Sequence, residues 1–351
     1  MAEINTSTLF RPIVAVPRDR GGRCPGPPRF HVGRARVGHA EAPDRTTGTT
    51  VVLFDPPSLG AVEVRGGAPG TMHTDALGAL GRYGWLSAVF LSGGSTFGLD
   101  AATGIRRRLR EEGVGGPILS GQIPVVGLSG AILYDLPSDR ELTADYVELG
   151  YQAAERARDT QWSSGRVGAA AGATVGKLWG RDRAMPGGLG ISVVDLPSGG
   201  QVEALAVLNS LGNVYDPFTG RPLAGIRGPS GDVLSREGLY RLWGKRPPPL
   251  RSPGTTLLVL WTDVELERVD LLRLCQVAHD AVASSIYPSH WPGDGDTVFA
   301  VSTSRNPTPR IRKGRDGRFG PSPVRVPLET LLLGGMRAAE LALREAGRRS
   351  R

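Results

Sequence analysis

The sequence predicts a mixed α/β protein built around one large core. Continuous apolar runs of strand length, at residues 85–91 and 256–262, predict buried strands. Apolar residues at helical spacing, as from Leu271 to Val282, predict amphipathic helices. The chain has 351 residues, 40% of them hydrophobic and 22% charged, which is enough to fill a sizeable core. No internal break separates two cores, so we expect a single domain.

The first strands are expected to form a hairpin. Residues 49–54 have strand character, Asp55-Pro56-Pro57 is typical of a turn, and residues 61–65 alternate like a returning strand. A glycine-rich turn at residues 92–95 then leads from a buried strand into a helix that ends near Gly113.

The later part of the chain alternates between strands, helices and loops. Residues 217–254 contain many Gly, Pro and Arg residues, and a loop of this length in a compact protein is usually exposed or functional. Residues 1–30, rich in Pro and Arg, are predicted to be an extension or a disordered arm. The other expected elements are strands at residues 125–136, 190–196, 202–209, 256–262 and 297–303, and helices at residues 146–157, 235–243, 271–282 and 328–346.

Composition excludes several classes of protein. Two Cys residues cannot form a disulfide framework, and the five His residues lack ligand spacing, so we predict no metal and no cofactor. The net charge of +8 comes largely from residues 305–325, which we interpret as a solvated basic loop and not a specific nucleic-acid site. No signal peptide or membrane span is recognisable, so we expect a soluble cytoplasmic protein.

The peptide bond between Gly254 and Thr255 is a candidate site of self-cleavage. A Pro-rich loop runs into this Gly-Thr pair, and a buried strand follows at once. If the bond were cut, Thr255 would carry both a nucleophilic hydroxyl and a free α-amine that serves as its base. A simple turn before a strand is the structural alternative.

Several stretches in a fixed order resemble one family. The chain is similar to the P1 peptidases of peptidase family S58, which include DmpA-type aminopeptidases, β-aminopeptidases, the ThnT pantetheine hydrolase and NylC nylon-oligomer hydrolases, and which cleave themselves before a Ser or Thr. The matching stretches are Val37-Gly38-His39, residues 47–53, 64–70, 91–102, 131–136 and 172–178, Asn209 with Gly212-Asn213-Val214, Gly254-Thr255-Thr256, and residues 294–300.

This resemblance implies a four-layer αββα sandwich, of the type shared with ornithine acetyltransferase. It also implies self-cleavage that yields a large fragment, residues 31–254 plus the extension, and a small fragment, residues 255–351. Members with Asn before Thr are frequent, so Gly254 departs from the common pattern. A homotetramer or dimer of cleaved protomers is expected from the habit of the family, with a small amide or peptide substrate.

The resemblance also implies roles for particular residues. Thr255 is the nucleophile, and two acids orient its hydroxyl and amine; an Asn and a Tyr donate to the developing oxyanion, and a Lys supplies positive charge. Each of these residues has a structural alternative, and the Asp-Gly-Asp stretch alone is also typical of a turn or of part of a calcium loop. The candidate site is Thr255, Asp294, Asp296, Asn209, Tyr134 and Lys177, with Gly66, Gly67, Gly93, Gly94 and Ser95 as candidate pocket residues.

Two other functions remain open from the sequence. One is acyl transfer of the ornithine acetyltransferase kind, which would need an added amine acceptor. The other is an uncleaved, inactive homologue that binds small molecules or nucleic acid. The sequence does not decide between aminoacyl amides, pantetheine-like compounds and nylon-like oligomers as substrates.

Overall fold

The computed structural model describes most of the chain between residue 35 and residue 350. The expected N-terminal extension and the basic loop lie outside the described residues. No helix in the described part combines the length and the apolar character needed to cross a membrane. The described ranges are 35–81, 84–117, 124–136, 144–159, 162–197, 199–245, 248, 253–304 and 326–350.

A nine-stranded mixed sheet forms the centre of the molecule. Its strands follow the order β10-β11-β14-β16-β2-β4-β7-β3, and β1 pairs with β2. The bounds are β1 Ala35–Glu41, β2 Gly48–Val64, β3 Thr71–Met72, β4 Trp85–Ser92, β7 Leu128–Ile132, β10 Gly188–Asp195, β11 Gln201–Asn209, β14 Thr255–Thr262 and β16 Thr297–Ser302.

In the described part of the chain, five α-helices and three small sheets complete the fold. The helices are α1 Ala101–Glu111, α2 Tyr146–Glu155, α3 Arg236–Lys245, α4 Arg268–Ser285 and α5 Leu328–Arg348. The small sheets pair β5 Gly116–Pro117 with β6 Pro124–Val125, β8 Thr174–Val175 with β9 Met185–Pro186, and β12 Asn213–Tyr215 with both β13 Pro222–Ala224 and β15 Ile286–Tyr287.

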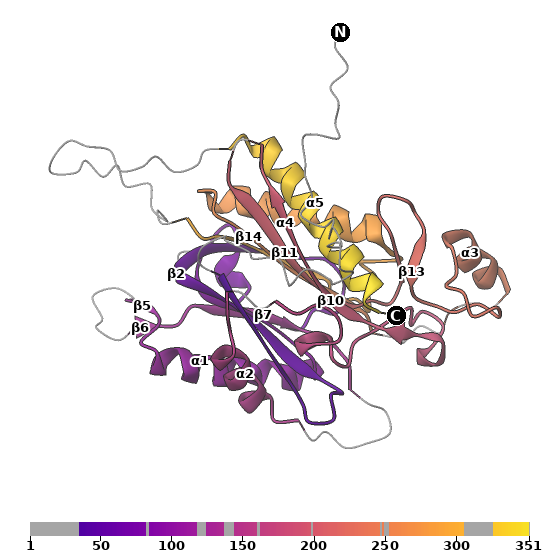
Figure 1. Cartoon of the computed structure of the whole chain (residues 1–351), viewed down its shortest axis with the longest axis horizontal. Coiled ribbons are helices and arrows are strands. Elements are labelled where there is room, and N and C mark those ends of the chain that lie inside the picture. The colour runs from indigo at the N-terminus through magenta and orange to yellow at the C-terminus, as the bar shows by residue number, and fades with distance from the viewer. Residues whose placement is uncertain are drawn as a thin grey trace, which may run out of the picture.

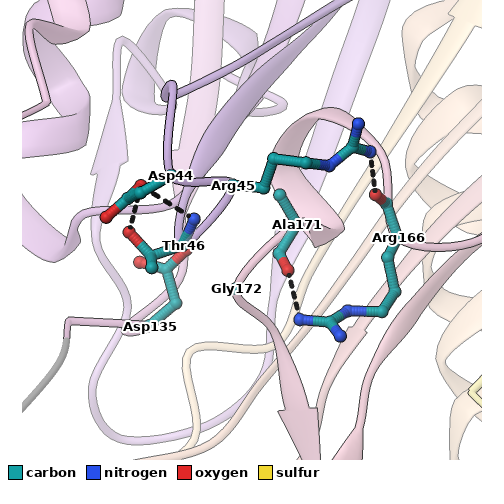
Figure 2. A pocket seen from close by; sticks show the side chains of 7 residues that line it. All are labelled: Asp44, Arg45, Thr46, Asp135, Arg166, Ala171 and Gly172. Atoms are coloured by element: carbon teal, nitrogen blue, oxygen red, sulfur yellow. Dashed lines mark hydrogen bonds between the residues drawn. The ribbon is translucent and has the colours of Figure 1, made fainter.

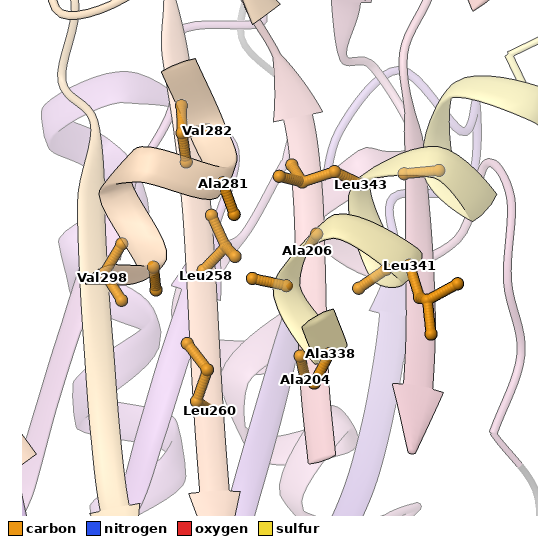
Figure 3. Close-up of a cluster of buried hydrophobic side chains, with 14 of the residues drawn as sticks. Ala204, Ala206, Leu258, Leu260, Ala281, Val282, Val298, Ala338, Leu341 and Leu343 are labelled. Atoms are coloured by element: carbon orange, nitrogen blue, oxygen red, sulfur yellow. The ribbon is translucent and has the colours of Figure 1, made fainter. Parts of the chain in front are cut away.

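Two helix pairs cover the outside of the two halves of the sheet. Figure 1 shows α4 and α5 over one half and α1 and α2 over the other. Beneath α4 and α5, the alternate residues of β11, β14 and β16 that point to this side form a dry aliphatic cluster with the helices (Figure 3). Cys275 of α4 is buried in this cluster, as its place on the apolar stripe predicts.

The other alternate residues of these strands belong to a second buried cluster. Leu257 and Val259 of β14 share this cluster with Val52 of β2 and Leu91 of β4, which come from the other half of the sheet. Burial on both faces explains why β14 reads as a continuous apolar run and not as an alternating one. The predicted α/β class is therefore correct.

Strand β14 occupies an interior position in the sheet. It pairs antiparallel with β11 and parallel with β16, and all eight of its residues are buried. The antiparallel register places Asn209 directly opposite Thr255. The sheet therefore holds the residue at the start of β14 from both sides.

The predicted hairpin at residues 49–65 is wrong. The structure has one long strand, β2, that continues through Asp55-Pro56-Pro57. Its ladder with β4 shifts register between Leu53 and Ser58, so the prolines fall where the regular pairing is interrupted. Proline has no N–H to donate, and a strand tolerates it at such an irregularity. The strand expected at residues 125–136 is also shorter, because β7 covers only Leu128–Ile132.

Glu203 on β11 is a buried acid far along the strand from Thr255. Its side chain is fully buried, and neither carboxylate oxygen has a hydrogen-bond partner within the described ranges. Burial raises the pKa of Glu203 to about 9, and the attraction of the Trp261 indole on β14 offsets only part of this effect. The carboxyl group is therefore neutral at physiological pH.

We expect Glu203→Gln to stabilise the protein at alkaline pH. The unfolded chain releases the Glu203 proton near pH 4.5 and the folded chain keeps it until about pH 9, so the wild type loses stability as pH rises through this window. Glutamine is neutral throughout, so the variant should gain at least about 1 kcal/mol over wild type at pH 8 and much less at pH 4.5. Thermal melting at both pH values measures this, and an equal difference at both would contradict it.

Candidate active site

The bond between Gly254 and Thr255 lies where the loop enters β14. Gly254 forms an isolated parallel bridge with Asp294, and its N–H donates to the Gly293 carbonyl at 3.1 Å. The Gly254 carbonyl accepts two hydrogen bonds, from the N–H of Gly295 at 2.9 Å and from the Thr255 hydroxyl at 2.5 Å. The buried hydroxyl of Thr255 therefore lies beside the carbonyl group that precedes it.

Two acids on the neighbouring loop face this bond differently. Both oxygens of Asp296 accept hydrogen bonds: Oδ1 from the N–H of Thr256 at 2.6 Å, and Oδ2 from the N–H and Nδ1 of His290 at 3.1 and 2.8 Å. Oδ2 of Asp294 accepts from the N–H of Trp291 at 2.8 Å. Oδ1 of Asp294 is buried and has no hydrogen-bond partner among the residues that the structure describes.

The free oxygen of Asp294 points at Gly254. A Cβ atom built on Gly254 would lie 2.2 Å from this Oδ1 and 2.6 Å from the backbone nitrogen of Leu211. Burial, and then the charge of Asp296, raise the pKa of Asp294 well above its usual range. A carboxyl group in this state can both accept and return a proton near neutral pH.

Asn209 and Lys177 form a rigid unit on the other side of Thr255. Lys177 Nζ donates to the carbonyl and to Oδ1 of Asn209 at 2.7 and 2.8 Å, and the N–H of Thr174 also donates to Oδ1 at 3.0 Å. These contacts fix Oδ1 as the acceptor and leave Nδ2 as the donor. One Nδ2 hydrogen is bound by the Tyr134 carbonyl at 3.1 Å, and an amide of this kind has a second to donate.

Lys177 is fully buried. Burial and the nearby charge of Arg181 lower its pKa to about 7, and Asp294 and Asp135 oppose this shift. The ammonium is therefore balanced between its charged and neutral forms at physiological pH.

Tyr134 contributes its backbone to this group. Its carbonyl binds Asn209, while its ring lies under the guanidinium of Arg181 at 5.2 Å and is 36% exposed. The structure thus brings together Thr255, Asn209, Lys177, Asp294 and Asp296, and places the backbone of Tyr134, not its ring, against Asn209.

The glycine loops pack closely against the segments that carry the site. A Cβ on Gly66 would lie 2.3 Å from the Asp294 carbonyl, and a Cβ on Gly67 would lie 2.5 Å from the Pro292 carbonyl. Because glycine has no side chain, the loop that carries Asp294 can approach at both positions. Gly94 donates its N–H to Asp135 Oδ1 at 2.7 Å, and a Cβ on Gly93 would lie 2.2 Å from Asp135 Oδ2.

Ser95 has a backbone role in the same turn. Its φ is 54°, a left-handed conformation, and its N–H donates to the Leu133 carbonyl at 2.9 Å. This contact ties the turn after β4 to the segment that carries Tyr134.

A cavity of about 500 Å³ lies beside Asp135 (Figure 2). Arg45 donates to the Arg166 carbonyl and Arg166 to the Ala171 carbonyl, at 3.2 and 3.1 Å, so both arginines are anchored along its wall. Burial raises the pKa of Asp135 to about 6. None of the five predicted pocket residues is in its lining, which is Asp44, Arg45, Thr46, Asp135, Arg166, Ala171 and Gly172.

Sequence reasoning missed three contributors to this region: the N–H of Gly295, the imidazole of His290 and the carboxyl of Asp135. The first is a backbone group, which carries no residue signal, and His290 lacks any ligand spacing. Asp135 and Gly295 both lie in matched stretches, residues 131–136 and 294–300, and this was the available signal. In the part of the chain that the structure describes, no cluster of three or more His, Cys, Asp or Glu residues is placed to hold a metal.

Two solved structures that are titled as aminopeptidases have a similar fold. A Burkholderia sp. beta-aminopeptidase matches with a TM-score of 0.62 and 19% identity, covering 91% of this chain and 84% of that one. The L-aminopeptidase D-Ala-esterase/amidase of Ochrobactrum anthropi, described as a variant of the Ntn hydrolase fold, matches with a TM-score of 0.58 and 16% identity over 90% and 84%. These two likenesses show the fold that the chain shares with them.

The chain belongs to peptidase family S58, whose model matches residues 31–346. An uncharacterised aminopeptidase of Mycobacterium tuberculosis is 37% identical over 288 residues, which cover 78% of this chain and 80% of the relative. A 6-aminohexanoate-oligomer endohydrolase of Kocuria sp. is 29% identical over 298 residues, covering 83% and 79%. The recognition made from the ordered motifs is confirmed, and the protein is an amidohydrolase.

Proposed function

We propose that the protein is a self-processing N-terminal-nucleophile amidohydrolase of the aminopeptidase type, cleaved between Gly254 and Thr255. The observation that carries this proposal is the contact of the Thr255 hydroxyl with the carbonyl of Gly254 at the start of an interior strand. Cleavage there would give residues 1–254 and 255–351 as two fragments of one domain. The helix pairs outside the two halves of the sheet and the buried cluster between these halves support a four-layer arrangement.

Self-cleavage needs a base before any free amine exists. The Thr255 hydroxyl attacks the Gly254 carbonyl carbon, and its proton passes to Asp294 Oδ1. The N–H of Gly295 already donates to the carbonyl oxygen on which negative charge develops. The C–N bond then breaks, Asp294 returns the proton to the nitrogen of Thr255, and water hydrolyses the resulting ester. The products are a carboxylate on Gly254 and a free amine on Thr255.

In the cleaved enzyme the amine of Thr255 takes over as the base. It accepts the hydroxyl proton during attack on a substrate amide and passes it to the leaving amine. Asn209 Nδ2 is oriented to donate to the oxyanion, because Lys177 and Thr174 fix its other end. Asp294 and Asp296 balance the positive charge that the amine acquires.

The substrate we propose is a small aminoacyl amide or peptide. Relatives named as aminopeptidases and as 6-aminohexanoate-oligomer endohydrolases support an amide with an amino group at some distance from it. The cavity beside Asp135 has acidic and basic groups on its wall and a volume suited to a small polar molecule (Figure 2).

The intact mass of the purified protein under denaturing conditions tests this proposal. Two fragments that join at Gly254 and Thr255 are expected, followed by release of free amine from amino-acid amides by the cleaved protein. A chain that keeps its full mass after long incubation would overturn the self-processing function. Cleaved protein that turns over only with an added amine acceptor would indicate a transferase.

We expect Gly254→Ala to slow self-cleavage by about tenfold or more. The new methyl group would collide with Asp294 Oδ1 and with the backbone of Leu211, so the carbonyl under attack must move from its position beside the hydroxyl. The fraction of cleaved chain over time measures this. Gly244→Ala on α3 is the control, because its methyl group would meet no atom within 4 Å. Cleavage of the Gly254 variant at the wild-type rate would contradict this explanation of why glycine stands here.

A further inference from the structure

His290 reaches the nucleophile through Asp296. It lies in the loop between β15 and β16, where its backbone N–H and its Nδ1 both contact Oδ2 of Asp296. Because a carboxylate only accepts, Nδ1 carries a proton. The other oxygen of Asp296 binds the N–H of Thr256, the residue that follows the nucleophile. An unbroken path of hydrogen bonds therefore runs from the imidazole to the start of β14.

The backbone of His290 is held in an uncommon conformation. Its φ of 61° is left-handed, a region that few residues other than Gly adopt and in which Asn, Asp and His are the most frequent exceptions. This conformation directs the N–H and the ring of one residue to the same carboxylate oxygen. The convergence of these two donors on one carboxylate oxygen, which the sequence alone did not indicate, is the observation from which we infer a function.

A second histidine packs against the ring of His290. His279 of α4 packs edge-on against His290, with ring centroids 4.9 Å apart and planes at 74°. Nε2 of His279 lies 3.1 Å from the Glu63 carbonyl, and burial lowers the pKa of His279 to about 4, so this ring is neutral at physiological pH. On the same side, the N–H of Arg65 donates to the Asp296 carbonyl at 2.9 Å.

We propose that His290 is a positioning residue for both self-cleavage and hydrolysis: as a double hydrogen-bond donor to Asp296 it fixes that carboxylate to β14 and leaves Asp294 as the acid that exchanges protons. This inference rests on the proposed function and assigns different duties to the two acids. Asp296 has three donors on its two oxygens, whereas Asp294 keeps one oxygen unpaired and directed at Gly254.

The charged groups around His290 and Asp294 support these different duties of the two acids. Burial alone would lower the pKa of His290, but its hydrogen bond to Asp296 and the negative charge of Asp296 outweigh burial and raise this pKa. The His279 carbonyl also raises the pKa, and the charge of Arg65 lowers it. The groups that act on Asp294 are Asp296, which raises its pKa, and His290 and Lys177, which lower it. Loss of the positive charge on His290 would therefore raise the pKa of Asp294 further.

Two variants separate the side chain from the backbone conformation. His290→Gly keeps the left-handed conformation but removes the ring, and we expect self-cleavage to slow by about tenfold or more. His290→Asn tolerates the same conformation and offers an amide N–H near the place of Nδ1. We expect this variant to cleave within about threefold of wild type at its own optimum pH, with the midpoint of its pH profile at higher pH because the charge is gone.

His73 provides the matched control. It is also a histidine at a left-handed position, with φ 57°, but it is exposed. His73→Gly and His73→Asn should cleave at the wild-type rate, and melting temperatures should show that all four variants are folded during the assay.

Cleavage of His290→Gly at the wild-type rate would overturn the inference. So would a pH midpoint of His290→Asn identical to that of wild type, or an Asn variant that is as slow as the Gly variant. If the wild type itself does not cleave, the proposed function fails first, and this outcome is distinct from the other three.

Discussion

A Thr255→Ala variant should remain a single chain and should hydrolyse no amide substrate. The methyl group of alanine has no hydroxyl to attack the Gly254 carbonyl, so neither the ester nor the free amine can form. Intact mass and release of amine from amino-acid amides measure the two losses. The fold should persist, since among the described residues the missing hydroxyl makes a single hydrogen bond, to the preceding carbonyl.

The neighbouring threonine supplies the control for this variant. Thr256 is equally buried, and its hydroxyl has no hydrogen-bond partner among the described side chains and backbone groups. Thr256→Ala should therefore cleave normally, and Thr255→Ser should also cleave because it keeps a hydroxyl. A Thr255→Ala protein that still separates at this bond would show that another group cuts it.

Asn209→Ala should lower turnover by about 100-fold to 1,000-fold. Loss of one well-placed oxyanion donor typically costs about 3 to 4 kcal/mol of transition-state stabilisation. The effect should fall on kcat more than on KM, because the interaction strengthens as charge develops on the oxygen. Steady-state kinetics of the cleaved enzyme on an aminoacyl amide measure both constants.

Asn209 also supports the fold, so its removal needs a structural comparison. Asn213 is equally buried and is similarly satisfied, with Oδ1 accepting from Ile226 at 2.8 Å and Nδ2 donating to Leu234 at 3.0 Å. Asn213→Ala should lower the melting temperature to a similar degree without the loss in kcat. Equal losses of kcat in both variants would mean that Asn209 acts only through stability.

The sequence predicted most of the elements, and it named residues that the structure places close together. Apolar runs located β4, β11, β14 and β16, because burial on one or both faces leaves a strong signal. The ordered motifs brought together Thr255, Asn209, Lys177 and the two acids, and the structure places these side chains around one peptide bond.

The features that the sequence did not show depend on the three-dimensional course of the chain. The Asp55-Pro56-Pro57 stretch has the composition of a turn, and only the pairing of β2 with strands distant in sequence keeps it extended. His290 has no spacing signal, since its partner Asp296 is set by a loop conformation. Tyr134 was expected to donate to the oxyanion, and the sequence did not show that its backbone carbonyl also binds Asn209.

The interior position of β14 affects how the cleaved protein would unfold and refold. Its pairing with β11 crosses the proposed cut, so the fragments stay joined by a full ladder of backbone hydrogen bonds after the chain is broken. Once denatured, however, they would have to find each other again, and refolding would depend on concentration where the uncut chain folds by itself. Maturation would thus turn a reversible fold into one maintained by the barrier to its unfolding.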